Sequence, residues 1–116
     1  MNIAGLVFVG TRTSARAAMT GFVQDVLGLA LADVPGVDAD VFVLPDGSSF
    51  AVTPSEERCE ERTVGFLVED LDSAAAERGA AGVDIDREIA TNARFRHAHF
   101  RAPDGQLDKL VELRNG

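Results

Sequence analysis

The 116 residues are 46% hydrophobic and 26% charged, which is the balance of a single globular domain with a core of its own. A formal net charge of −8 argues against a protein that holds duplex nucleic acid by its phosphates. No apolar run approaches the roughly 20 residues that a membrane-spanning helix needs, so we expect neither a membrane nor a nucleic-acid partner.

The first half of the chain is predicted to begin with a strand and a long helix. Residues 3–10 are apolar and rich in β-branched side chains, which favours a strand. Over residues 13–27 apolar side chains recur at steps of three and four, which predicts an amphipathic helix that ends at Gly28. Gly21, inside this helix, is interpreted as room for a close approach to the sheet. The predicted core face of the helix consists of Ala15, Ala18, Met19, Phe22 and Val26.

Three shorter strands complete this half. They are expected at 29–33, 39–44 and 48–53, with a Pro-Gly turn at 35–36 before the second of them. A Pro-Asp-Gly sequence at 45–47 joins the last two strands. This sequence predicts a hairpin with a glycine-containing turn.

The second half repeats this order of elements. An Asp-Leu-Asp-Ser sequence at 70–73 supplies a helix cap, and the helix is expected to run to about Gly79 or Ala81 before Gly82 stops it. Each half therefore reads as β-α-β-β-β. The strands of the second half are expected at 63–69, 84–89, 93–101 and 106–113, with a Pro-Asp-Gly turn at 103–105.

A 58-residue repeat relates the two halves. The Pro-Asp-Gly turns recur at this spacing, and the strand-like run at 5–9 aligns with 63–67 at the same spacing. The only cysteine, Cys59, lies between the halves and cannot form an intrachain disulfide; its acidic neighbours disfavour a thiolate. The repeat divides the single domain 1–116 into module one at 1–53, an acidic linker at 54–62 and module two at 63–116.

Together with this order of elements, three runs of sequence resemble the vicinal oxygen chelate superfamily, which includes glyoxalases, extradiol dioxygenases and bleomycin-resistance proteins. The runs are Asp-Val-Leu-Gly-Leu at 25–29, Phe-Leu-Val-Glu-Asp-Leu-Asp at 66–72 and Phe-Arg-Ala-Pro-Asp-Gly at 100–105. The resemblance covers essentially the whole chain and implies an α+β fold. Two tandem β-α-β-β-β modules would form a curved mixed sheet around a cup, with the helices on its outer face, and a homodimer is the common assembly.

The resemblance also implies where a metal ion would be held. Metal enzymes of this superfamily bind a divalent ion in the cup, through side chains on the first and last strands of the modules. These positions fall on Thr63 and Lys109 in module two and, through the 58-residue repeat, on Gly5 and Ala51 in module one. Glycine and alanine have no donor side chain, lysine carries the wrong charge and threonine is a poor ligand. We therefore predict that the inherited metal site is lost and that no cofactor is bound.

Alternation along the strands predicts which side chains face the cup. His97 and His99 are two residues apart and share one face of a strand. They could chelate a transition metal if a third ligand lay nearby, or make hydrogen bonds as ordinary strand residues. If the metal-ligand positions face inward, as the resemblance implies, a three-residue turn brings His99 opposite Lys109 and gives the cup a basic end. The predicted ligand-binding residues are Thr63, Leu67, Phe95, His97, His99, Lys109 and Val111.

Three functions are open from the sequence. We predict the first, metal-independent binding of a small molecule in the cup, similar to the bleomycin-resistance proteins; Lys109 favours an anionic or carbonyl-bearing ligand. The second is a glyoxalase- or dioxygenase-like enzyme that uses displaced metal ligands, or His99 and Lys109 as an acid–base pair. The third is a dimerisation or protein-interaction module. The first residues lack the order of a signal peptide, so we expect a cytoplasmic protein, and we expect a homodimer.

Overall fold

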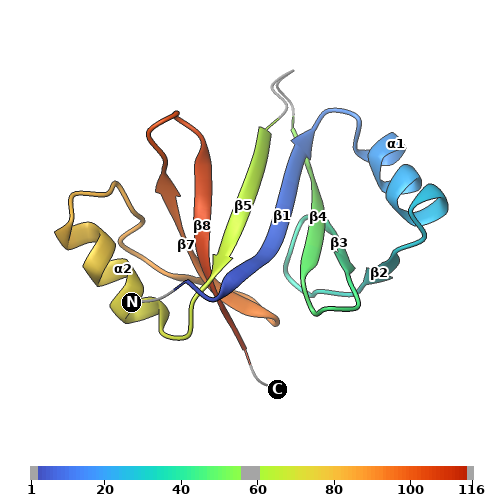
Figure 1. Cartoon of the computed structure of the whole chain (residues 1–116). Coiled ribbons are helices and arrows are strands. Elements are labelled where there is room, and N and C mark those ends of the chain that lie inside the picture. Colours follow the sequence, from blue (N-terminus) through green and yellow to red (C-terminus); the bar gives the residue numbers. More distant parts are fainter. Residues whose placement is uncertain (1–2, 56–60, 115–116) are drawn as a thin grey trace.

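The described residues form an eight-stranded sheet that curls around a concave face, with helices packed on its opposite, outer face (Figure 1). The computed structural model describes residues 3–55 and 61–114, so Cys59 and most of the expected linker at 54–62 lie outside the described residues. The strands are β1 (Gly5–Thr13), β2 (Ala30–Ala32), β3 (Asp40–Val43), β4 (Ser49–Pro54), β5 (Glu61–Leu67), β6 (Ala90–Thr91), β7 (Phe95–Arg101) and β8 (Leu107–Leu113). The helices are α1 (Arg16–Gly21), its π-helical continuation η1 (Phe22–Val26) and α2 (Leu71–Ala80).

The two modules meet at the centre of the sheet, where β1 runs antiparallel to β5. Within each module the first strand pairs in parallel with the last, β1 with β4 and β5 with β8. The strand order across the sheet is β2-β3-β4-β1-β5-β8-β7-β6. The predicted α+β fold, with two β-α-β-β-β modules, a curved mixed sheet and outer helices, is confirmed.

The spacing of 58 residues does not relate the first strands of the modules. In the sheet, Gly10 of β1 pairs with Ala51, 41 residues further along the chain. Gly65 of β5 pairs with Lys109, 44 residues further along. The Pro-Asp-Gly turns before β4 and β8 are 58 residues apart, so residues of β4 correspond to residues 58 further along in β8. Because the separation between paired strands is three residues longer in module two, residues of β1 correspond to residues 55 further along in β5.

This shift changes which residue of module one corresponds to Thr63. The counterpart is Phe8, and the expected alignment of Gly5 with Thr63 is wrong. The pairing of β1 with β5 agrees with a spacing of 55. Gly10 pairs with Thr63, and Phe8 pairs with Gly65. Adding 55 to Phe8 gives Thr63 and adding 55 to Gly10 gives Gly65, so the two pairs are equivalent. The physical cause is the three additional residues that module two has between its first and last strands.

The first helix differs from the helix expected at 13–27. It begins at Arg16, and from Phe22 onward it winds as a π-helix. A π-helical turn holds an extra residue, which rotates the face that the helix presents to the sheet. Val23 is fully buried, whereas Phe22 and Val26 are 48% and 68% exposed. Ala15 and Ala18 are exposed as well, so the predicted core face is wrong except for Met19, which packs against the buried cluster.

Hydrogen bonds hold α1 against the sheet. Arg16 donates from Nε and Nη2 to the carboxylate of Asp40 in β3, at 3.1 Å each, and the hydroxyl of Thr20 donates to the same carboxylate at 2.6 Å. These hydrogen bonds keep the pKa of Asp40 below its usual value. Gly21 does not provide the expected close approach, because a Cβ built there would meet no atom of another element within 4 Å.

The second helix follows the prediction. The carboxylate of Asp70 accepts a hydrogen bond from the Ser73 N–H and caps α2, and Gly82 stops the helix with a φ of 89°. Arg96 of β7 pairs with Asp72 in the first turn, at 3.4 Å, and so links the helix to the sheet. No helix within 3–55 and 61–114 is long and apolar enough to cross a membrane.

The expectation of a strand at 84–89 is wrong. This segment, all of it described, has only an isolated bridge from Ile85 to Phe100, and the short β6 follows it. The carboxylate of Asp86 accepts the backbone N–H of His99, which a regular ladder would give to a carbonyl. Aspartate side chains often compete with the backbone in this way.

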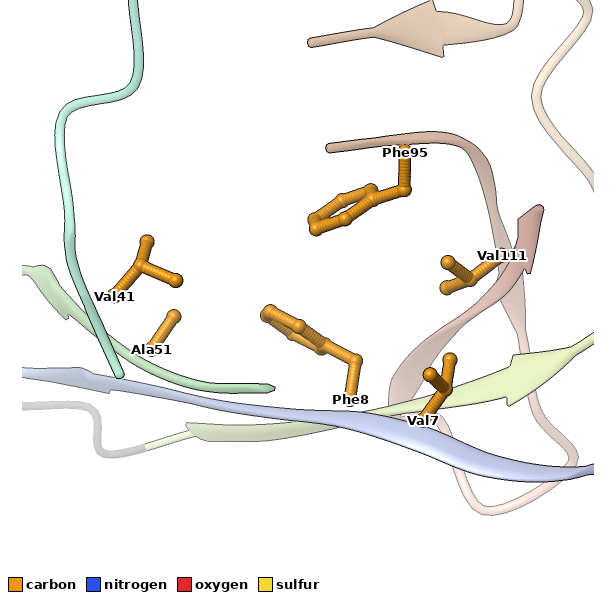
Figure 2. Packing of buried hydrophobic residues seen from close by; sticks show 6 residues of the cluster. All are labelled: Val7, Phe8, Val41, Ala51, Phe95 and Val111. Atoms are coloured by element: carbon orange, nitrogen blue, oxygen red, sulfur yellow. The ribbon is translucent and has the colours of Figure 1, made fainter. Parts of the chain in front are cut away.

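Side chains on the two faces of the sheet form separate hydrophobic clusters. On the outer face, Val23 packs with Phe42 and Val52 beneath the first helix, and Leu71 and Ala74 of α2 pack on the second module. In Figure 2 the rings of Phe8 and Phe95 on the concave face lie next to each other, and both extend toward Val41 and Ala51. This inner cluster is the apolar floor of the cup, and it consists of Val7, Phe8, Val41, Ala51, Phe95 and Val111.

Candidate functional site

The concave face of the sheet holds a pocket of about 300 Å³. Its apolar wall comes from the inner cluster and from Val34 and Val37 in the loop before β3. Its polar wall comes from β7, β8, the end of β6 with the turn at 92–94, and Thr53 of β4. A concave, mostly apolar surface with a few converging polar groups is the usual form of a small-molecule site.

Lys109 is the only lysine of the chain, and it is 6% exposed. Its Nζ lies 3.6 Å from the ring centroid of Phe8 and 4.8 Å from that of Phe95. No ion pair to Lys109 is present among the described residues, and burial lowers the pKa of Lys109 to about 8. The two ring faces partly replace water around the ammonium. Lysine is almost never buried without a partner, so this placement is a strong sign of function.

Two glycines make room for the ring of Phe8. A Cβ added at Gly10 would lie 2.8 Å from Cε2 of that ring. A Cβ added at Gly65 would lie 2.7 Å from Cβ of Phe8 and 2.9 Å from a methyl carbon of Val111. Such distances are shorter than carbon atoms tolerate, so glycine at both positions allows the ring to lie where it meets Lys109.

His97 is neutral near pH 7. Burial, with the positive charges of Lys109 and His99 adding to it, lowers the pKa of His97 to about 4. Its ring packs against Phe95, with 5.5 Å between the centroids. Its Nδ1 is buried and has no hydrogen-bond partner within the part of the chain that the structure describes. A buried nitrogen without a partner, in the wall of a pocket, is a group that a ligand or a water molecule can satisfy.

His99 lies directly opposite Lys109 in the β7–β8 pair, as predicted. Its Nδ1 is 3.3 Å from a carboxylate oxygen of Asp86. Burial, and then the charge of Lys109, lowers the pKa of His99, against the opposing effect of Asp86. His99 lines a second hollow, of about 190 Å³, together with Thr63. Phe8, Thr53 and Lys109 line both hollows.

Arg94 brings a second positive charge to the larger pocket. It belongs to a turn in which the Asn92 side chain accepts hydrogen bonds from the backbone N–H groups of Arg94 and Phe95. The Nε of Arg94 is buried and has no partner among the described residues. The wall of this pocket, as far as it is described, contains no carboxylate. The pocket therefore offers positive charge and hydrogen-bond donors that no acidic side chain satisfies.

The predicted ligand-binding residues divide into two groups. Val111 belongs to the inner cluster beneath the cup and is fully buried, and Leu67 packs against that cluster; neither lines the larger pocket or the smaller hollow. The others line the larger pocket or the smaller hollow; they are Thr63, Phe95, His97, His99 and Lys109.

The sequence prediction missed Phe8, Arg94 and the loop residues Val34 and Val37. Phe8 was hidden by the incorrect spacing of the repeat, which assigned its place to Gly5. Lys109 was predicted as a ligand-binding residue, although that prediction did not use the fact that it is the only lysine among the eleven basic residues.

Four residues occupy the positions to which the resemblance assigns a metal ion. With the corrected spacing they are Phe8, Ala51, Thr63 and Lys109, and all four line the cup. Their side chains are two hydrocarbons, a hydroxyl and an ammonium. Nowhere in the described ranges do three His, Cys, Asp or Glu side chains come together as a metal site.

Solved structures share this fold at low sequence identity. A methylmalonyl-CoA epimerase from Mycobacterium tuberculosis has a TM-score of 0.80 at 18% identity, over 97% of this chain and 90% of that chain. The 2,3-dioxygenase LapB from Pseudomonas sp. KL28 has a TM-score of 0.80 at 20% identity, over 99% of this chain and 42% of that chain. A halotolerant catechol dioxygenase, BphC, has a TM-score of 0.73 at 21% identity, over 97% of this chain and 40% of that chain.

These neighbours have the fold of the vicinal oxygen chelate superfamily, which is the fold that the sequence predicts. The chain spans most of the epimerase but less than half of each dioxygenase. No protein-family model and no curated protein sequence matches the chain. Likeness at this level of identity shows the fold alone, so the chemistry of the cup is argued from its own residues.

Proposed function

We propose that this chain binds a small molecule with a carboxylate or carbonyl group in its cup, through Lys109 and without a divalent metal ion. The observation that carries this proposal is the only lysine of the chain, which is buried in the pocket wall with no ion pair among the described residues. Burial of an unpaired ammonium is unfavourable. A ligand oxygen with negative charge or a lone pair would offset that cost.

Two further groups support an oxygen-rich ligand. Nε of Arg94 and Nδ1 of His97 are buried without described partners, and both residues line the same pocket as Lys109. A carboxylate could accept hydrogen bonds from the guanidinium and from the ammonium at once. A cationic ligand would meet two like charges instead. Among the fold neighbours, a methylmalonyl-CoA epimerase has been solved in complex with methylmalonyl-CoA, so the fold can hold a small organic ligand.

A divalent ion does not fit the positions that the resemblance assigns to it. Phe8 and Ala51 offer no donor, and the positive charge of Lys109 repels a cation. Thr63 alone supplies a neutral oxygen. We infer that the ammonium takes the role of the ion and polarises the ligand oxygen in its place.

A thermal-shift panel of matched small anions and cations tests the proposal. Carboxylates such as glycolate are expected to raise the melting temperature by several degrees at concentrations well above their Kd, because they bind only the folded chain. Lys109→Met should abolish the shift. Arg101→Met is the matched control, because it also removes one positive charge but from an exposed residue that lines neither hollow.

Two outcomes would contradict metal-free anion binding. The first is a large shift with cations and none with any anion. The second is stoichiometric zinc, nickel, manganese or iron in protein purified without chelators, lost in a variant that carries both His97→Ala and His99→Ala.

A second candidate function is catalysis by His99 and Lys109. His99 lies opposite Lys109, and Asp86 orients its ring, which is the arrangement of a base held by a carboxylate. In this reading Lys109 holds the ligand oxygen and His99 moves a proton. Chemical change of a bound carboxylate, followed by NMR and lost in His99→Gln while binding persists, would favour the enzyme over the binding protein.

A further inference from the structure

Lys109 is an amine placed to react with its ligand as well as to hold it. We propose that its Nζ forms an imine with the carbonyl carbon of a small oxo acid, an aldehyde or ketone that also carries a carboxylate. The inference rests on the proposed function, because it assigns a substrate class and a covalent step to the same pocket.

The surroundings of Lys109 remove what normally keeps a lysine unreactive. The rings of Phe8 and Phe95 replace water around Nζ, and no ion pair in the described part of the chain holds its proton. Burial lowers the pKa of Lys109 to about 8, so a fraction of the molecules carries a free electron pair on Nζ near neutral pH. Apart from the two histidines, every other basic side chain is an arginine, which does not form an imine of this kind.

The step needs no reactant beyond the ligand. The electron pair of Nζ attacks the carbonyl carbon, a C–N bond forms, and the π electrons of the C=O bond move to oxygen. One proton passes from nitrogen to that oxygen and gives a carbinolamine. The carbinolamine then loses its hydroxyl group and the remaining N–H proton as water, and the C=N bond forms. His99 lies opposite Lys109, and His97 is its neighbour on the same face of β7, so both rings are placed to pass these protons.

Arg94 accounts for the carboxylate of the ligand. Its Nε is buried in the wall of the pocket that Lys109 also lines, and no described residue hydrogen-bonds to it. Guanidinium groups bind carboxylates by paired hydrogen bonds. A ligand whose carboxylate contacts Arg94 and whose carbonyl carbon contacts Lys109 would span the polar wall of the 300 Å³ pocket.

Reductive trapping tests the imine directly. The folded chain is treated with glyoxylate and sodium cyanoborohydride at pH 7, which converts an imine into a stable carboxymethyl amine. Peptide mass spectrometry then compares Lys109 with the N-terminal amine, the other primary amine of the 116 residues. We expect Lys109 to be labelled on the order of a hundredfold faster in the folded chain than in the chain unfolded in guanidinium chloride. Labelling no faster than in the unfolded chain would overturn the inference, and this comparison needs no variant.

Variants then test the oxo-acid class. Arg94→Gln should slow the labelling of Lys109 by glyoxylate but not by acetaldehyde, which has no carboxylate, and Arg101→Gln should slow neither. Equal slowing of both reagents by Arg94→Gln, or of neither, would contradict the role given to Arg94. Lys109→Arg keeps the charge and should leave only the N-terminal label.

Glycolate separates failure of the imine from failure of the binding site. Glycolate has the carboxylate of glyoxylate but a hydroxyl group in place of its aldehyde, so it can bind without forming an imine. A thermal shift with glycolate and no trapping by glyoxylate would leave the proposed function standing and remove the imine. Absence of both would remove both. Protection of Lys109 from labelling by excess glycolate is the result expected if the two share one site.

Discussion

The ammonium of Lys109 loses most of its hydration when the chain folds, because the side chain is 6% exposed. Contact with the faces of Phe8 and Phe95 restores part of the lost stabilisation. The loss of hydration lowers the pKa of Lys109 from 10.5 to about 8. At about 1.4 kcal/mol for each pKa unit, the charged side chain costs the folded state roughly 3 kcal/mol at pH 7. Proteins tolerate such costs mainly where a residue serves a function.

The first prediction concerns Lys109→Met and its dependence on pH. Between pH 8 and 10.5 the unfolded chain binds more protons at Lys109 than the folded chain, so this residue makes stability rise with pH across that window. Methionine removes the cost but also the ring contacts of the ammonium. We therefore expect the variant to be more stable than the wild type by roughly 1–3 kcal/mol at pH 7, with a difference that shrinks steadily toward pH 10.5.

Urea unfolding at pH 7 and at pH 10 measures this difference. Arg101→Met serves again as the control, since it removes one positive charge from an exposed position. A Lys109→Met variant less stable than the wild type at pH 7 would show that the ring contacts outweigh the loss of hydration.

The faces of single residues were predictable only in part. The period of two along a strand, combined with the inward-facing positions that the resemblance implies, was enough to place His97, His99 and Lys109 on the concave face. That period does not predict how deeply a side chain on the concave face is buried, because burial depends on which residues the loops and the neighbouring module cover. For this reason Val111, on the same face as Lys109, was expected to line the cup but is buried in its floor.

Among the secondary-structure elements, β1 and β5 each contain a glycine, Gly10 and Gly65, at a position with no room for a side chain, whereas the glycine of the first helix, Gly21, has free space around it. Gly65 lies against Phe8 and Val111 with no room for a Cβ, whereas Gly21 faces open space within α1. In the sequence, Gly65 and Gly21 look alike, because each interrupts a regular element. Only the packing between the two modules shows that glycine is necessary at position 65.

The second prediction compares Gly65→Ala with Gly21→Ala. The first should destabilise the chain by about 1–3 kcal/mol, because the added methyl group displaces Phe8 and Val111 in a packed core. The second should stabilise it by up to about 1 kcal/mol, because alanine is the better helix former. Chemical unfolding of both variants checks the pair. Effects of the same sign would mean that the close contact at Gly65 is relieved by movement of the strands.

The helices show where prediction from periodicity works and where it fails. α2 was predicted closely, because its aspartate cap and its terminal Gly82 are local signals. The π-helical turn at η1 has no such signal, since steps of three and four residues assume an α-helix throughout. Phe22 and Val26 lie outward and Val23 inward, and Ala15 and Ala18, which precede η1, are exposed as well.

For the molecule as a whole, the exposed apolar side chains of the first module bear on assembly. Phe22, Val26 and Leu27 in and after η1, and Leu31 in β2, are each about half exposed or more. The third prediction is a homodimer whose contact includes this surface. Light scattering at high micromolar concentration should give twice the mass of the chain, and Leu27→Asp should lower it. Ala76→Asp, on an exposed position of α2, is the control that should leave the mass unchanged. Monomer alone at that concentration would contradict the prediction.

The overall architecture was the most predictable level, because turns that occur in both halves give the order of elements and the resemblance implies how two such modules form one curved sheet. What could not be predicted is the relative register of the modules. It depends on the pairing of β1 with β5, and no single module contains that information. The corrected register is what brings Phe8, rather than Gly5, into contact with Lys109.

The only lysine of the chain also gives the molecule a single cleavage point for a protease that cuts after lysine. That bond, between Lys109 and Leu110, lies in β8, which is enclosed by β5 and β7. Both residues are buried, so the protease can reach the bond only when β8 leaves the sheet. When opening and closing are fast relative to cleavage, the digestion rate therefore measures the fraction of molecules in which β8 has left the sheet, and a ligand held by Lys109 would lower that rate in proportion to its occupancy.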